Sequence, residues 1–98
     1  MRVYLKIHSR NEIETVAVCD ESLINKVFKE GNLKIEISER FFGTKLIPIE
    51  NALKILKEAS HFNIVGKNII SNAIELEILP EEGVRSINGI PMALKMMF

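Results

Sequence analysis

The N-terminal half of the chain is dominated by stretches in which apolar and polar residues alternate, the pattern of a strand with one buried face. The clearest example begins with Val3, Leu5 and Ile7, whose neighbours are basic or polar. Alternation or β-branched composition predicts strands over residues 2–8, 13–19, 33–37 and 45–47. Only a short turn at Ser9, Arg10 and Asn11 separates the first two strands, which favours an antiparallel hairpin.

Apolar spacings of three and four residues predict helices in three places. Asp20 is expected to cap a short helix that runs through residues 23–28 and ends at Gly31. Pro48 is expected at the first position of a second helix. A third stripe over residues 62–76 follows so closely that the last two should form a helical hairpin or one sharply kinked helix.

The C-terminal segment is predicted to be a second hairpin. Asn88-Gly89 suits a type I′ turn, which needs positive φ at both central positions, and strands are expected at residues 84–87 and 90–98. Pro91 lacks an N–H donor, so the last strand should lie at a sheet edge or begin beyond the proline. The resulting order, ββαβ(β)ααββ, predicts an α+β fold with a mainly antiparallel sheet and helices packed on one face.

Length and composition limit the class of protein. Ninety-eight residues, 47% apolar and 27% charged, predict one folded α+β domain over residues 1–98. The 13 basic and 13 acidic side chains cancel, so attraction to nucleic acid or anionic lipid is not a property of the whole chain. One cysteine, no signal peptide and no apolar span predict a cytoplasmic protein without a membrane partner.

The sequence contains no recognisable catalytic or metal-binding motif. His8, Cys19 and His61 are too widely spaced to supply the clustered ligands of a zinc site, so neither a metal nor a cofactor is predicted. No base lies close to Cys19, and the five glycines form no dinucleotide or P-loop pattern. We therefore predict no catalytic residue, and a binding function is favoured over an enzymatic one.

Basic side chains interleaved with an aromatic ring mark the polar face of the first strand. This combination suits RNA, because cations meet phosphates and rings stack on bases. The candidate nucleic-acid-binding residues are Arg2, Tyr4, Lys6, His8 and Arg10, with Lys95 added if the C-terminal strand pairs nearby. An ordinary solvated sheet face is the alternative interpretation.

A second group of residues is predicted to be structural or to allow a ligand close to the backbone. It comprises Gly43, Asn63, Gly66, Asn88, Gly89 and Pro91. Gly66 is the most informative, because glycine inside a helical pattern costs up to about 1 kcal/mol and therefore needs a reason. An enzyme site here would require Gly43, Asn63 and Gly66 to converge on one pocket.

Six segments also occur in the order seen in a known family. They are Cys19-Asp20-Glu21, Phe28-Lys29-Glu30-Gly31, Ser38-Glu39-Arg40-Phe41-Phe42-Gly43, Glu58-Ala59, Asn63-Ile64-Val65-Gly66 and Ile87-Asn88-Gly89-Ile90-Pro91. Over nearly the whole chain they resemble the small archaeal proteins of domain of unknown function family 424. The resemblance implies an archaeal, cytoplasmic protein and, by analogy, a role near translation or RNA. It supplies no catalytic residue.

Two classes of function follow as expectations. The first is a non-catalytic binding module that acts on RNA or a ribonucleoprotein. The alternative is a protein-interaction subunit of a cytoplasmic complex, or a homo-oligomer. This alternative is motivated by an edge near Pro91 and by surplus apolar residues at Phe41, Phe42, Met97 and Phe98.

Overall fold

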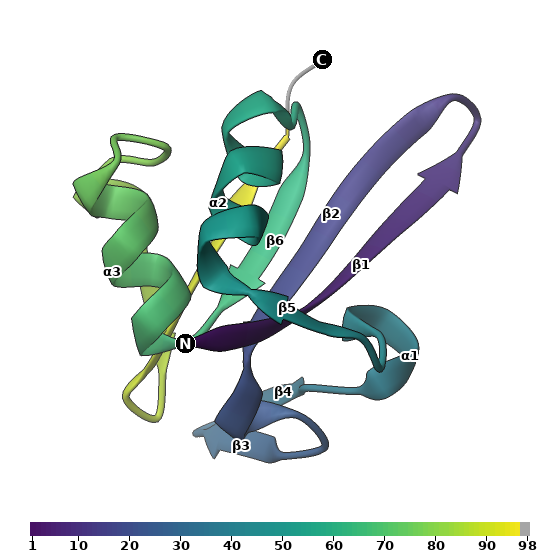
Figure 1. Ribbon diagram of the computed structural model, residues 1–98. Coiled ribbons are helices and arrows are strands. Elements are labelled where there is room, and N and C mark those ends of the chain that lie inside the picture. Colours follow the sequence, from purple (N-terminus) through teal and green to yellow (C-terminus); the bar gives the residue numbers. More distant parts are fainter. Residues whose placement is uncertain (97–98) are drawn as a thin grey trace.

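A computed structural model describes residues 1–96, which form two sheets and three α-helices (Figure 1). The larger sheet comprises β1 (Arg2–Arg10), β2 (Ile13–Asp20), β5 (Leu46–Pro48), β6 (Phe62–Val65), β7 (Arg85–Ile87) and β8 (Ile90–Lys95). The smaller sheet pairs β3 (Val27–Glu30) with β4 (Leu33–Glu36). The α-helices are α1 (Glu39–Phe42), α2 (Ile49–Glu58) and α3 (Lys67–Glu75), and two 3-10 helices are η1 (Glu21–Leu23) and η2 (Glu81–Gly83).

The large sheet is covered on both faces. Helices α2 and α3 pack on one face, and the β3–β4 hairpin with α1 lies against the other. Strand β2 contributes to both cores, because Val16 and Val18 point under the helices while Ala17 and Cys19 point under the small hairpin. The predicted α+β fold with a mainly antiparallel sheet is confirmed, although α1 lies on the face opposite the two longer helices.

The strand order β5-β1-β2-β6-β8-β7 contains one parallel pair. β2 and β6 run parallel with Val16 beside Phe62, whereas the other neighbouring strands of this sheet are antiparallel. The connection from β2 to β6 passes through the small sheet, α1, β5 and α2. Two long-separated parts of the chain thus meet at the centre of the sheet.

The predicted helical hairpin is wrong, because a strand separates α2 from α3. Phe62, Ile64 and Val65 are at most 1% exposed, so β6 is covered on both sides, and with three apolar residues out of four it lacks a clear alternation. A short run of this kind fits a buried helix as well as a strand by periodicity alone. Gly66, at φ 125°, ends β6 and precedes the first turn of α3.

The helix predicted between Asp20 and Gly31 is also wrong. The chain makes only the 3-10 turn η1 before it enters strand β3. Asn25 has a φ of 66°, outside the right-handed helical region, and its N–H donates to the carbonyl of Ile37 at 2.6 Å. The apolar residues have helical spacing, but pairing of β3 with β4 decides the local structure.

Between β4 and β5 the chain forms the short helix α1, which includes Phe41 and Phe42. The side chain of Ser38 caps this helix by accepting from the N–H of Phe41 at 3.2 Å, and Gly43 at φ 84° ends it. The predictions for the elements on either side of α1 agree with the structure. The strands expected at 33–37 and 45–47 correspond to β4 and β5, and α2 starts directly after Pro48.

The C-terminal hairpin forms as predicted, with φ of 51° at Asn88 and 79° at Gly89. β8 lies between β6 and β7, however, so the expectation that Pro91 marks a sheet edge is wrong. The carbonyl of Pro91 accepts from the N–H of Gly66 at 2.9 Å. Backbone groups of one strand residue point to the same side, so the missing N–H of Pro91 faces the end of β6, where the chain turns into α3.

Met97 and Phe98, which were counted among the surplus apolar residues, lie outside the described residues. Within residues 1–96, no helix has both the length and the apolar character that crossing a bilayer would require.

Candidate functional site

Helix α1 covers the middle of the polar face of β1. The Nζ of Lys6 donates to the carbonyl oxygen of Arg40 at 2.8 Å, and Nε2 of His8 lies 2.7 Å from the carbonyl oxygen of Phe41. The ring of His8 also stacks on that of Phe41, with centroids 4.8 Å apart. The face predicted to bind nucleic acid is therefore a contact surface for α1 along much of its length.

The other three candidates on β1 have different surroundings. Arg2 forms an ion pair with Glu21 at 3.3 Å, and because both side chains are about half exposed the pair adds little stability. Tyr4 is half-buried against the core under the β3–β4 hairpin. Arg10, beside the turn, is exposed.

Lys95 does not join this group. Its Nζ donates to the carbonyl of Ala59 at 3.1 Å and lies 5.8 Å from the centre of the Phe62 ring. Phe62 belongs to the core under α2 and α3, so Lys95 is on the face of the sheet opposite His8. Strands β2 and β6 also separate β8 from β1.

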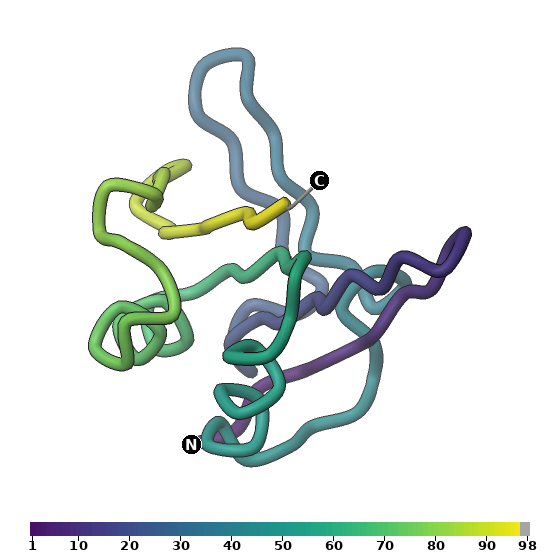
Figure 2. Tube along the Cα trace, turned by 90° about the horizontal axis from the view of Figure 1, so that it is seen from above, coloured from purple at the N-terminus to yellow at the C-terminus, as the bar shows by residue number. Residues whose placement is uncertain are grey.

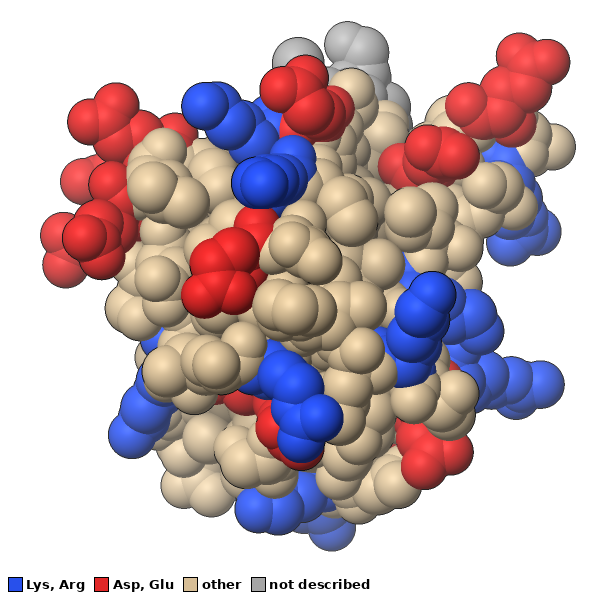
Figure 3. Space-filling model, in the orientation of Figure 1, with Lys and Arg blue, Asp and Glu red and all other residues tan. Residues whose placement is uncertain are grey.

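A shallow hollow of roughly 430 Å³ lies where α1 meets the turn end of the hairpin. Its walls include the stacked rings of His8 and Phe41 together with Arg10, Ile13 and Thr15. α1 and the segment after it add two exposed cations beside β1, giving an exposed set of Lys6, Arg10, Arg40 and Lys45. Lysine and arginine side chains gather over this part of the molecule in Figure 3. We call the hollow and these four cations the basic-aromatic face.

Three residues of this face were not among the candidates from the sequence. Arg40, Phe41 and Lys45 come from α1 and the segment that follows it, and hydrogen bonds to β1 position them there. Lys45, for example, accepts from the N–H of Leu5 at 3.4 Å. Nothing in the spacing of these residues indicates that they approach His8, because the approach depends on how α1 docks.

Packing against Asp20 explains the glycine at position 66. A Cβ at this position would clash with the carboxyl group of Asp20, and the φ of 125° is itself unfavourable for other residues. The Asp20 carboxylate accepts from the N–H groups of Asn68 at 2.8 Å and Ile69 at 3.0 Å. Asp20 is thus a helix cap, but for α3, which begins nearly 50 residues later in the chain, not for the segment beside it.

Burial changes the acid–base behaviour of Asp20 and its neighbour. Burial raises the pKa of the Asp20 carboxyl above its usual 3.8, and the hydrogen bonds from Asn68 and Ile69 only partly oppose this. Burial, with the adjacent Asp20 charge, raises the pKa of the Cys19 thiol to about 12. Cys19 is fully buried and stays a thiol near neutral pH, which argues against a nucleophilic role.

Gly43 and Asn88 also have local explanations. Gly43 approaches β1 closely, since a Cβ there would lie 3.2 Å from the carbonyl oxygen of Leu5. The turn at Asn88 is held by Glu30, whose carboxylate accepts its N–H at 2.8 Å. Within residues 1–96, Gly43, Asn63 and Gly66 line neither this hollow nor the larger groove on the opposite face of the hairpin, so these two concavities do not support an enzyme site at those residues.

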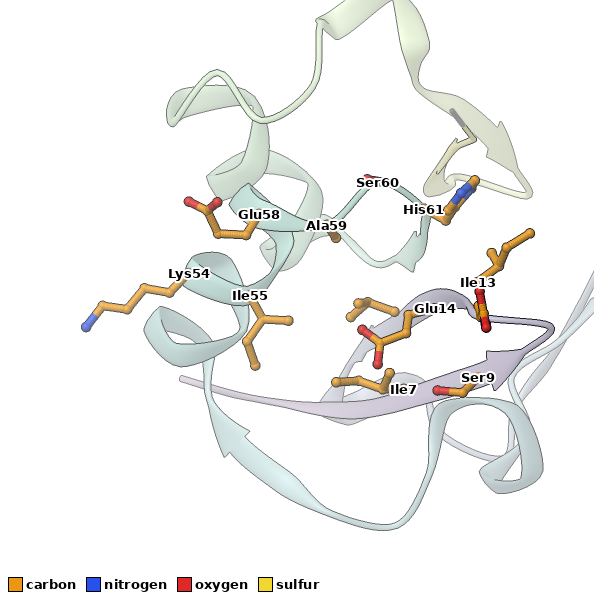
Figure 4. Close-up of a pocket in the computed structure, with 12 residues that line it drawn as sticks. Ile7, Ser9, Ile13, Glu14, Lys54, Ile55, Glu58, Ala59, Ser60 and His61 are labelled. Carbon is orange, nitrogen blue, oxygen red and sulfur yellow. The ribbon is translucent and has the colours of Figure 1, made fainter. Parts of the chain in front are cut away.

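A larger groove of roughly 820 Å³ lies on the opposite face of the hairpin, between it and the C-terminal end of α2 (Figure 4). Its apolar wall comes from Ile7, Val16, Ile55 and Ala59. Glu14 points from β2 into the space towards Ile55. We call this feature the acidic groove, because Glu12, Glu14 and Glu58 are among the residues that line it.

The turn end of the hairpin projects beyond the strands that flank it (Figures 1 and 2). β5 pairs only with residues 2–4, and β6 only with residues 16–19. Asn11 and Glu12, at φ 52° and 67°, form a two-residue turn, which makes Arg10 and Ile13 a hydrogen-bonded pair. Backbone groups at the next positions, Ser9 and Glu14, therefore point away from the hairpin and towards solvent.

Comparison with known proteins identifies a family and a shared fold. The sequence model of a family described as "Protein of unknown function (DUF424)" matches residues 7–97. The crystal structure of an uncharacterized conserved protein from Methanopyrus kandleri is similar, with a TM-score of 0.82 and 24% identity, over 100% of this chain and 96% of that chain. At this identity, the likeness establishes the fold alone. No curated protein matches the chain.

Proposed function

The chain belongs to the DUF424 family of proteins of unknown function, and from its geometry we propose that it is a non-catalytic module that binds single-stranded RNA through the basic-aromatic face. The observation that carries this proposal is the stacked ring pair of His8 and Phe41 in a hollow bordered by Arg10. Aromatic walls accept bases without strict sequence preference, and exposed cations meet the phosphates.

Several features set the expected strength of this binding. Four exposed cations border the face, but the whole chain has a formal net charge of zero, so long-range attraction to RNA is weak. The side chains of Lys6 and His8 are each engaged by a backbone carbonyl of α1. Arg10, Arg40 and Lys45 are therefore expected to be the main phosphate contacts. We expect affinity in the non-specific range, with a Kd of about 1–100 μM at physiological salt.

The test is a fluorescence anisotropy titration of a labelled single-stranded oligoribonucleotide of mixed sequence. About three phosphate contacts predict that log K falls with log salt with a slope near −2. Arg10→Ala should weaken binding roughly tenfold at low salt and make the slope shallower by about 0.7, because one counterion fewer is released. Phe41→Leu keeps an apolar side chain but removes the ring, and should weaken binding by about tenfold without changing the slope.

Lys57→Ala is the matched control for this experiment. It removes one exposed positive charge from α2, on the other face of the sheet, and should leave affinity and slope nearly unchanged. Two results would count against the proposal: no binding at low salt, or equal losses with Lys57→Ala and Arg10→Ala. Circular dichroism of each variant confirms that the fold is retained.

A further inference from the structure

The acidic groove exists because α2 ends before the hairpin does. The helix stops at Glu58, and Ala59 adopts an extended conformation that leads the chain into β6. The outer part of the hairpin therefore has no helix above it. Ile7 is 45% exposed there, although it continues the alternation that buries Val3 completely. An aliphatic surface is thus left open beside the end of a helix.

Charge is distributed unevenly around this surface. Glu12 and Glu14 line the rim from the hairpin, and Glu58 borders the groove from the end of α2. Lys54 also borders the groove, and the side chains of Lys54 and Glu58 both point away from the hairpin, which leaves the hairpin glutamates as the charges beside the apolar wall (Figure 4). Among residues 1–96, no lysine or arginine forms an ion pair with Glu12 or Glu14.

We infer that the acidic groove binds a segment of a partner protein that carries an aliphatic side chain next to lysine or arginine. The aliphatic side chain would pack against Ile7 and Ile55, and the cation would lie near Glu14. Burying carboxylates against a neutral or acidic partner would cost desolvation without compensation, whereas a cation offsets that cost. The same carboxylates repel phosphates, so this groove and the RNA proposal concern different ligands.

The backbone at this end of the hairpin favours an extended segment. The N–H and C=O groups of Glu14 point away from β1, into the region that β6 leaves open by starting at Phe62. An added peptide can hydrogen-bond to such an edge while its alternate side chains enter the groove. Basic segments with this composition are typical of the flexible arms of nucleic-acid-binding proteins.

The probe for this inference is a fluorescein-labelled hexapeptide of alternating lysine and valine, with anisotropy as the readout. The same peptide with glutamate in place of lysine should bind at least roughly tenfold more weakly, because like charges then meet. Glu14→Gln should weaken the lysine peptide roughly threefold, and Ile7→Ser by a similar factor. N-methylation of the central valine should weaken it further if the segment pairs with the strand edge.

Glu50→Gln provides the matched control, since it removes an exposed carboxylate from the first turn of α2, at the other end of the helix. Both Ile7→Ser and Glu14→Gln alter exposed side chains, so the fold should persist. Equal binding of the lysine and glutamate peptides, or equal effects of Glu14→Gln and Glu50→Gln, would overturn the inference.

Two further outcomes are decisive. Light scattering that shows a dimer of this chain, disrupted by Glu14→Gln and unaffected by the peptide, would assign the groove to a second copy and overturn a basic partner segment. Glu14→Gln should leave RNA affinity unchanged or slightly increased, because a repulsive charge is removed. A loss of RNA affinity in this variant would contradict the separation of the two faces.

Discussion

The two ends of the β1–β2 hairpin are built from different kinds of contact. At the end next to α3, Cys19 is fully buried and Asp20 is 5% exposed, and the Asp20 carboxylate is fixed by two backbone N–H groups of α3. At the turn end, Ile7 and Ile13 are 45% and 50% exposed. We call these the anchored end and the turn end. The contrast indicates that the anchored end holds the fold, while the turn end is available for binding.

The turn end itself presents two unlike faces. Side chains alternate along a strand, so His8 and Arg10 point to the side of α1, while Ile7 and Ser9 point to the side of α2. The docking of α1 adds cations and a ring to the first side, whereas α2 ends short of the second and leaves it apolar with an acidic rim. Under the two proposals, one short hairpin meets two partners of opposite charge.

The largest expected effect on stability comes from the anchored end. Gly66→Ala should lower the free energy of unfolding by about 3 kcal/mol, because the new Cβ is strained at φ 125° and displaces the carboxyl of Asp20. Gly31→Ala is the control, since Gly31 has a φ of 59° but open space around it, and should cost only about 1 kcal/mol.

Urea unfolding followed by circular dichroism measures both changes. Ile13→Ser, at the turn end, should change stability by less than about 0.5 kcal/mol. Similar losses of unfolding free energy for Gly66→Ala and Ile13→Ser would contradict the proposed difference between the two ends.

A smaller effect concerns pH. The folded state raises the pKa of Asp20 above 3.8, so between 3.8 and this folded value the folded state binds more protons than the unfolded state. The free energy of unfolding of the wild type should therefore fall relative to that of Asp20→Asn as pH rises through this window. The difference between the two free energies should be constant above and below the window. Unfolding curves of both proteins across acidic pH measure the difference. If the free energy of unfolding of the wild type instead rises relative to that of Asp20→Asn, the hydrogen bonds to α3 outweigh burial in setting the pKa of Asp20.

The local elements could be predicted because their signals lie within a few residues. Alternation identified β1, β-branched residues identified β2, Pro48 marked the start of α2, and Asn88-Gly89 fixed the C-terminal turn. β6 and β3 could not be found in this way. Both faces of β6 are buried, which removes alternation, and β3 is defined by its pairing with β4.

The candidate site was predictable only in part, for the same reason. His8 and Arg10 stand out on an alternating strand, but Phe41 and Arg40 join them only through the docking of α1. Asp20 has the character of a helix cap, yet the helix that it caps is distant in sequence. The acidic groove depends on where α2 ends relative to Ile7, which no local pattern specifies.

The most direct test of the two-faced turn end is a map of backbone amide shifts in ¹⁵N-labelled protein, titrated first with the oligoribonucleotide and then with the lysine–valine peptide. The RNA should shift the amides of His8, Arg10 and Phe41, and the peptide should shift those of Glu14 and Ile55, with the anchored end unaffected by either. Shifts of the same amides by both ligands, or shifts confined to the anchored end, would contradict the account.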